Sequence, residues 1–123
     1  MRWLPPFIWA GIITYLSLMP ANNLPDYDLF HLLFVDKWIH AIFYFILALL
    51  LFYAWNEGNS IILKAVLILF VCVLFGTGIE IIQNEYTTSR RFEWLDIVFD
   101  TIGAIAYVSI WLRRRSLDFL KKS

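Results

Sequence analysis

The stretch of sequence that decides the fold is VDKWIHAIFYFILALLLFYAW, residues 35–55. From position 37 onward it is apolar enough, and at about 20 residues long enough, to cross a lipid bilayer as a helix. Its first turns nevertheless carry Asp36, Lys37 and His40. Asp36 and Lys37 alone could be an ordinary helix cap and a boundary cation, but ionisable residues inside a membrane usually belong to a functional site. The stretch therefore predicts a membrane span that opens with candidate site residues.

The whole chain has the composition of a membrane protein. Hydrophobic residues make up 61% of its 123 residues and charged residues 16%, whereas soluble domains contain about 45–50% and about 25%. The formal net charge is zero, so the composition does not indicate nucleic-acid binding. One helical bundle uses the whole length, which predicts a single domain over residues 1–123.

Four stretches are long and apolar enough to span a bilayer, at about 3–19, 37–55, 61–84 and 94–112. The predicted fold class is therefore all-α, a four-helix transmembrane bundle. The polar turn at residues 56–60 makes the second and third helices antiparallel neighbours. Residues 24–35, LPDYDLFHLLFV, are too few to span and predict a short interfacial segment between the first two helices.

Lysine and arginine counts near the helix ends predict that both termini are cytoplasmic. One side of the membrane would hold seven basic residues: Arg2, Lys64, Arg113, Arg114, Arg115, Lys121 and Lys122. The other side would hold only Lys37, Arg90 and Arg91. Met19 and Pro20 stand where a signal peptidase needs small residues, so we expect the first helix to be retained.

With this topology, polar stripes on three helices fall at the same depth, in the outer half of the bilayer. Helical spacing of three or four residues places the members of each stripe on one face. The stripes are Asp36, His40 and Tyr44; then Gly76, Glu80 and Gln83; then Asp96, Asp100, Gly103 and Tyr107. Because isolated charges are costly in hydrocarbon, such residues face the bundle interior or a water-filled cavity. We expect a small polar cavity that opens outward beneath the loops at residues 21–35 and 85–92.

These residues, in this order and at these spacings, resemble the VanZ-like family. The matching elements are Asp36-Lys37-x-x-His40-x-x-x-Tyr44, Glu80-x-x-Gln83, Arg90 with Asp96 six residues on, Asp-Thr-Ile-Gly at 100–103, and Ser17-Leu18-Met19-Pro20. The resemblance implies a small multi-pass protein of the bacterial plasma membrane that acts at the cell envelope. The family is named after a member that gives low-level resistance to the glycopeptide antibiotic teicoplanin.

The sequence departs from the family pattern at three places. Asp100 stands where the family usually has asparagine, and Tyr107 stands where it has a small residue. The extra carboxyl at position 100 is expected either to change what the site binds or to require Arg90 or Lys37 nearby. The stretch after Gln83 is one residue longer than usual, which leaves open whether Arg90 or Arg91 pairs with the acids.

The first interpretation of the site is a binding pocket for an amphiphile, either a membrane lipid or a lipid-linked envelope molecule. The basic and hydroxyl groups suit an anionic or hydroxyl-rich head group. The ligand-binding candidates are Asp36, Lys37, His40, Tyr44, Glu80, Gln83, Arg90, Asp96 and Asp100. The sequence is also compatible with a homo-oligomer.

Two other interpretations are open. In a membrane-embedded enzyme acting on a lipid-linked substrate, the candidate acid–base residues are His40, Glu80, Asp96 and Asp100. No cofactor is predicted, but a divalent metal would find ligands in His40, Glu80 and Asp96. In the other interpretation, the polar residues only hold the helices together, although hydrogen bonds between membrane helices average only about 0.6 kcal/mol.

Overall fold

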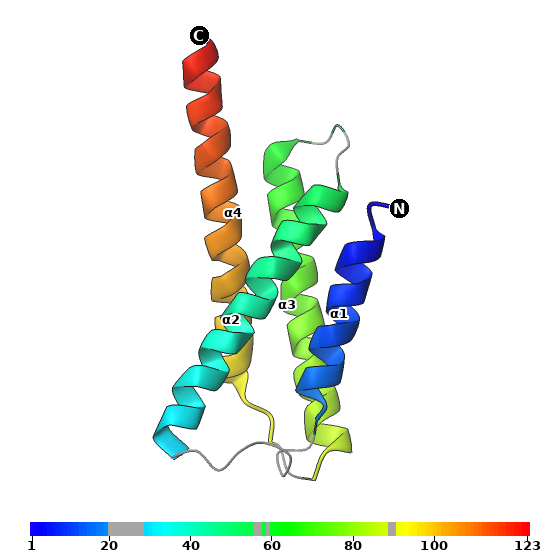
Figure 1. Cartoon of the computed structure of the whole chain (residues 1–123). Helices are drawn as coiled ribbons and strands as arrows, with labels where there is room; N and C mark the ends of the chain where they lie inside the picture. The colour runs from blue at the N-terminus through cyan, green and yellow to red at the C-terminus, as the bar shows by residue number, and fades with distance from the viewer. Residues whose placement is uncertain (20–28, 56–57, 59, 89–90) are drawn as a thin grey trace.

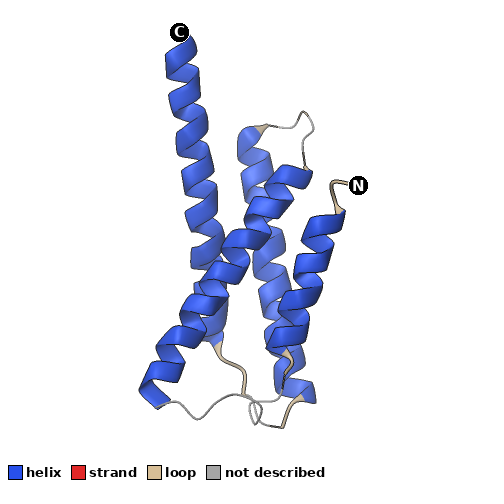
Figure 2. Ribbon diagram, in the orientation of Figure 1, coloured by secondary structure: helices blue, strands red, loops and turns tan. Residues whose placement is uncertain are grey.

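The computed structural model describes residues 1–19, 29–55, 58, 60–88 and 91–123, and only the backbone of residues 29–34. This part of the chain forms four α-helices and no strands: α1 (Leu4–Ser17), α2 (Leu29–Ala54), α3 (Ile61–Tyr86) and α4 (Trp94–Lys122). The helices form a bundle with both termini at the same end (Figure 1). Figure 2 shows the same four helices, with loops in tan where the connecting residues are described. The predicted all-α, four-helix class is confirmed, and its orientation in the membrane stays a prediction.

Three of the described helices are long and apolar enough to cross a membrane: α2 over Val35–Ala54, α3 and α4. A helix bonds its own backbone groups, which have no water partners in hydrocarbon. Helix α1 has 14 residues and begins with prolines in its first turn, where a missing N–H does no harm. At 1.5 Å per residue it is shorter than a typical span.

Two helix boundaries differ from the expected spans. Helix α2 begins at Leu29 rather than near Lys37, so Asp36 lies inside the helix and is not its cap. The expected interfacial segment is therefore continuous with α2 from Leu29 onward, while residues 24–28 lie outside the described part. Helix α4 continues past Leu112 to Lys122. Hydropathy marks where apolar sequence ends, whereas the helical backbone continues through polar residues.

The outer surface of the described helices is strongly apolar. Phe7, Ile62 and Phe70 are 71%, 72% and 59% exposed. On a soluble monomer, a surface with so many exposed large apolar side chains would promote association. Around membrane-spanning helices, it is the surface that lipid chains cover.

All four helices contribute to the buried core, whose members are Ile13, Tyr44, Leu47, Ala48, Phe52, Ala65, Ile68, Cys72, Ile79, Ala104 and Val108. The most extensive contact is between α2 and α4. There Tyr107, one of the departures from the family pattern, packs edge-on against Phe45 at a centroid distance of 5.4 Å and in a tilted arrangement against Phe52 at 5.6 Å. The larger residue at position 107 is thus accommodated in an aromatic layer.

Polar contacts fix two of the other helix pairs. The Trp9 indole of α1 donates to the Phe43 carbonyl of α2 at 2.9 Å. Near the start of α3, Lys64 donates to the carbonyls of Phe52, at 3.1 Å, and of Trp55. Carbonyls at a helix C-terminus lack helical partners and attract cations, so Lys64 ties the end of α2 to the start of α3.

Candidate polar site between the helices

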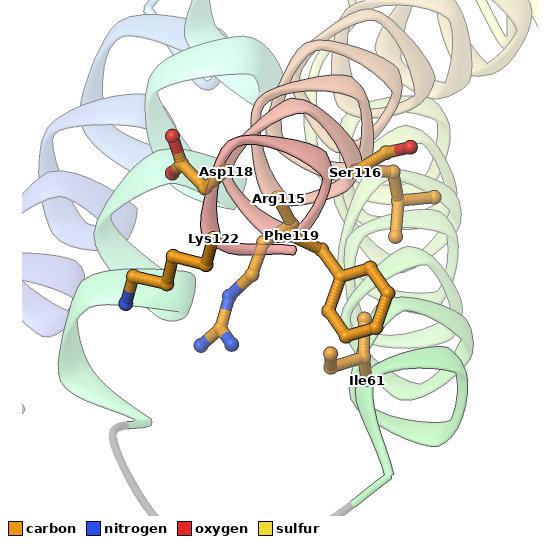
Figure 3. A pocket seen from close by; sticks show the side chains of 7 residues that line it. Ile61, Arg115, Ser116, Asp118, Phe119 and Lys122 are labelled. Carbon is orange, nitrogen blue, oxygen red and sulfur yellow. The ribbon is translucent and has the colours of Figure 1, made fainter.

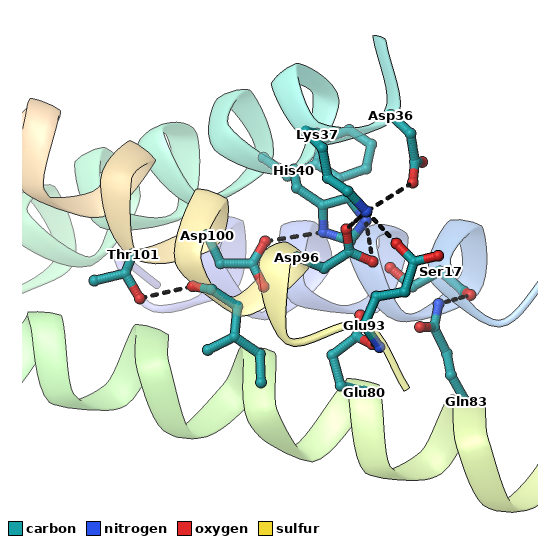
Figure 4. A network of polar contacts seen from close by, with 12 residues as sticks. Ser17, Asp36, Lys37, His40, Glu80, Gln83, Glu93, Asp96, Asp100 and Thr101 are labelled. Atoms are coloured by element: carbon teal, nitrogen blue, oxygen red, sulfur yellow. Dashed lines mark hydrogen bonds and ion pairs between the residues drawn. The ribbon is translucent and has the colours of Figure 1, made fainter. Parts of the chain in front are cut away.

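Six polar side chains from three helices are buried at the end of the bundle opposite the termini. Lys37, His40, Glu80, Gln83, Asp96 and Asp100 are each at most 6% exposed. Asp36 and Glu93 lie at the edge of this group, with side chains 39% and 45% exposed. We call these eight residues the polar cluster (Figure 4). Six of the eight residues lie on the stripes that helical spacing predicted; Lys37 lies beside one stripe, and Glu93 lies on none.

Lys37 lies at the centre of the outer part of the polar cluster. Its ammonium group forms ion pairs with Glu93 and Asp96 and lies 3.8 Å from Asp36. All three partners are acids, and two belong to α4 or the residue before it. Lys37 thus links α2 to the beginning of α4, and its donors are already engaged within the protein.

His40 lies one turn further along α2 and contacts two carboxylates. Its Nδ1 is 2.9 Å from Asp100 Oδ1, a hydrogen-bond distance. Its Nε2 faces Asp96 Oδ2 at 3.8 Å, which is too long for a hydrogen bond. Because a carboxylate only accepts, a neutral His40 beside Asp100 carries its proton on Nδ1, and its lone pair is then on Nε2. The carboxyl of Asp100 was expected either to change what the site binds or to require Arg90 or Lys37 nearby. Its hydrogen-bond partner in the described part is His40, and Arg90 lies outside that part.

Glu80 is 1% exposed, and only one of its two carboxylate oxygens accepts a hydrogen bond from a described residue. Its Oε2 accepts the backbone N–H of Glu93 at 3.1 Å. Its Oε1 is buried and has no hydrogen-bond donor among the described residues. The Asp96 carboxylate belongs to the same cluster (Figure 4), but it cannot supply the missing donor, because a carboxylate only accepts. A buried acceptor without a donor is costly, so this position calls for a proton or a cation.

Gln83, a member of the polar cluster, and Tyr44, which lies beside the cluster, make contacts of their own. Gln83 donates to the Ser17 carbonyl at the end of α1. Tyr44 is 1% exposed and also belongs to the apolar core. A Cβ at Gly76 would lie 2.6 Å from Asp100 Oδ2 and 3.3 Å from the Tyr44 hydroxyl, so both groups lie directly against this glycine.

Gln83→Leu is expected to destabilise the protein by about 1–3 kcal/mol, because it leaves the buried Ser17 carbonyl with one bond fewer and removes the described polar link between α1 and α3. The measurement is unfolding in mild detergent. Gln83→Glu should be at least as harmful, since a carboxylate cannot donate to a carbonyl. A Gln83→Glu variant as stable as the wild type would contradict this role.

Of the three basic residues predicted on the outer side of the membrane, only Lys37 belongs to the polar cluster as the structure describes it. Arg90 lies outside the described residues. Arg91 is exposed. In the described part, the polar cluster holds five carboxyls against Lys37 and His40. The described site is therefore rich in acids rather than in bases.

The structure also has a hollow of about 580 Å³ at the other end of the bundle (Figure 3). It lies between the first residue of α3 and the last turns of α4, beside Ile61, Arg115 and Phe119. No predicted site residue lines it. The loops expected to roof a cavity over the polar cluster, residues 21–35 and 85–92, include residues 21–28 and 89–90, which lie outside the described part.

The sequence analysis gave no specific role to two groups that contact the cluster residues, Glu93 and the Ser17 carbonyl. Glu93 was grouped only with the other acids, although it directly precedes α4 and binds Lys37. The sequence signal was its position three residues before Asp96, one turn away. Ser17 contributes a backbone carbonyl, which no side-chain pattern marks. Only the general lack of partners at a helix C-terminus could have suggested it.

A metal ion would find donors in this region. Asp36, His40 and Asp96 each offer one ligand atom, and these atoms lie within 4.8 Å of one another. Two members of this group, His40 and Asp96, are among the metal ligands considered from the sequence. Asp36 takes the third position instead of Glu80.

The fold and the polar cluster together define a small helical membrane protein with ionisable side chains buried between its helices. A family model described as VanZ/LLP1 matches residues 4–116, nearly the whole chain. The chain belongs to the VanZ/LLP1 family, as its motifs indicated. No curated protein and no solved structure matches it.

Proposed function

We propose that this VanZ-family membrane protein acts in the bacterial cell envelope, in the plasma membrane, by binding an amphiphilic or lipid-linked molecule at the polar cluster. The observation that carries the proposal is the position of the cluster edge. Asp36 and Glu93 keep side chains 39% and 45% exposed, and Trp38 and Trp94 beside them are 59% and 65% exposed. Polar and apolar surface thus meet at one place, which suits a molecule with a polar head and an apolar tail.

The contacts of Lys37 bear on the chemistry of the head group. Its ammonium already pairs with Glu93 and Asp96, so an anionic head would have to displace two carboxylates. The exposed edge itself is acidic. An amine-bearing head group therefore fits better than an anionic one.

A link to glycopeptide resistance follows from the family name. An envelope protein that binds a lipid-linked precursor, or the lipid-bearing antibiotic itself, would change how teicoplanin reaches its target. Expression in a susceptible bacterium should then raise the teicoplanin concentration that stops growth.

Two alternatives have specific observations in their favour. The close His40–Asp100 pair, at 2.9 Å, is typical of acid–base catalysis and favours an enzyme acting on a lipid-linked envelope substrate. The mutual contacts of Lys37, Glu93 and Asp96 favour a packing network without a ligand.

Native mass spectrometry of the protein in mild detergent tests the binding proposal. With equal amounts of phosphatidylethanolamine and phosphatidylglycerol added, we expect the amine lipid to be retained several-fold more. Asp36→Asn combined with Glu93→Gln should abolish the preference, because it removes the acidic edge. Asp118→Asn, an exposed carboxylate at the opposite end, is the matched control and should keep it.

The alternatives predict other results. A packing network gives no lipid preference, and the edge variants then alter stability alone. An enzyme gives turnover of an added lipid-phosphate substrate that disappears in His40→Gln. Equal retention of both lipids in the folded wild-type protein would overturn the amine-head proposal.

A further inference from the structure

We propose that Asp36, His40 and Asp96 form a binding site for a divalent transition metal, Zn²⁺ or Mn²⁺, with Glu80 as an additional acidic neighbour. The three ligand atoms come from two helices, and all lie within 4.8 Å of one another. The site goes beyond amphiphile binding and does not depend on it.

The separation of the His40 and Asp96 donors fits a shared ion. His40 Nε2 and Asp96 Oδ2 are 3.8 Å apart. Two ligands that are each about 2.0–2.2 Å from one metal lie about 3–4 Å apart. The gap that is too long for a hydrogen bond is thus the right size for a bridging ion. Asp36 is on the exposed edge of the cluster, where its side chain can turn toward the metal.

The contact with Asp100 favours the His40 tautomer whose Nε2 can bind a metal. Nδ1 lies 2.9 Å from Asp100 Oδ1, so a neutral His40 that donates to Asp100 has its lone pair on Nε2, the nitrogen 3.8 Å from Asp96 Oδ2. A carboxylate behind a ligating histidine is the usual support of such a ligand, because it fixes the tautomer and raises the basicity of the ring.

Glu80 supplies an independent sign that a cation belongs here. Its Oε1 is buried without a hydrogen-bond donor among the described residues, and the whole side chain is 1% exposed. It belongs to the same cluster as Asp96 and His40 (Figure 4). A divalent cation beside Asp96 would satisfy an oxygen that no described donor reaches.

The ammonium of Lys37 does not block the site. Lys37 pairs with Oδ1 of Asp96, whereas the oxygen that faces His40 is Oδ2. One carboxylate can therefore bind the ammonium and the metal through different oxygens. In the described part, one lysine stands against five carboxyls, so a divalent cation also reduces an excess of negative charge.

The types of ligand indicate which metal ions the site would bind. An imidazole with carboxylates suits Zn²⁺ or Mn²⁺, whereas Mg²⁺ and Ca²⁺ prefer oxygen ligands alone. The full-length protein in detergent, stripped with EDTA and dialysed, should bind one Zn²⁺ or Mn²⁺ per chain by calorimetry. The metal should raise the midpoint of thermal unfolding, and equal concentrations of Mg²⁺ or Ca²⁺ should not.

Substitutions locate the metal. Asp36→Asn, at the exposed edge, should fold normally and weaken Zn²⁺ binding at least tenfold. Co²⁺ added in place of Zn²⁺ should give visible d–d absorption with the wild type, and His40→Gln should lose this absorption. Asp100→Ala should weaken binding about 10–100-fold through loss of the histidine support. Asp118→Asn should bind like the wild type.

The proposal is overturned if the folded wild-type protein binds neither Zn²⁺ nor Mn²⁺. It is also overturned if Asp36→Asn binds Zn²⁺ as tightly as the wild type. Because metal binding is measured without added lipid, and lipid retention can be measured after EDTA treatment, failure of one proposal is distinguishable from failure of the other.

Discussion

Gly103→Ala is expected to destabilise the protein by at least about 3 kcal/mol, one of the two largest effects that the structure predicts. A Cβ at position 103 would lie 2.7 Å from the carbonyl carbon and 2.9 Å from the Cα of Ala41, and closer still to the carbonyl oxygen. Overpacking usually costs about 1–3 kcal/mol when side chains can adjust. Here the obstacle is the backbone of α2, so the two helices would have to separate.

Two other glycines provide graded controls. A Cβ at Gly78 would meet nothing within 4 Å, so Gly78→Ala should leave stability unchanged or raise it by up to about 1 kcal/mol through helix propensity. A Cβ at Gly76 would press on the side chain of Asp100, which can shift, so Gly76→Ala should fall between the two. Thermal unfolding in one detergent measures all three. A Gly103→Ala variant as stable as Gly78→Ala would contradict the close approach of α2 and α4.

The sequence predicted the helices well where apolar sequence stops at a true helix end. The starts of α3 at Ile61 and of α4 at Trp94 agree with the expected boundaries, because polar turns precede both. The predicted second span, residues 37–55, agrees with the apolar stretch Val35–Ala54, but the sequence did not show that the helix begins before Asp36 and Lys37. Both residues are in fact buried or half-buried inside a helix that begins at Leu29.

The membership of the candidate site was more predictable than its pairings. Helical spacing put His40, Glu80 and Asp96 on inward faces, and the structure buries all three. Which groups touch depends on how closely α2 and α4 approach at Gly103 and on where α1 ends. Neither is encoded in the spacing along one helix. The pairing of His40 with Asp100, and of Gln83 with a backbone carbonyl, therefore could not be predicted.

Lys37→Met is expected to produce the second large loss, about 3–5 kcal/mol. Lys37 is 5% exposed, and its ammonium pairs with both Glu93 and Asp96. Removing one partner of a buried ion pair leaves an uncompensated buried charge, which costs more than the pair contributes. Lys121→Met, an exposed lysine near the C-terminus, is the matched control and should change stability by less than about 0.5 kcal/mol.

A double-mutant cycle separates the charge effect from loss of packing. If Asp96 is the main group left unpaired, Lys37→Met combined with Asp96→Asn should be less destabilised than the sum of the single variants, by about 0.5–3 kcal/mol. Additive effects would mean that the two groups do not depend on each other, contrary to the observed ion pair.

The Lys37→Met variant also connects the ion pair to the proposed metal site. Removing a fixed cation next to Asp96 reduces the repulsion that an incoming divalent ion meets, and it leaves more negative charge for that ion to neutralise. Zn²⁺ should therefore stabilise Lys37→Met more than the wild type, which thermal unfolding with and without Zn²⁺ measures. Stabilisation smaller than in the wild type would mean that Lys37 holds Asp96 in place for the metal. In that case the lysine organises the site more than its charge opposes the ion.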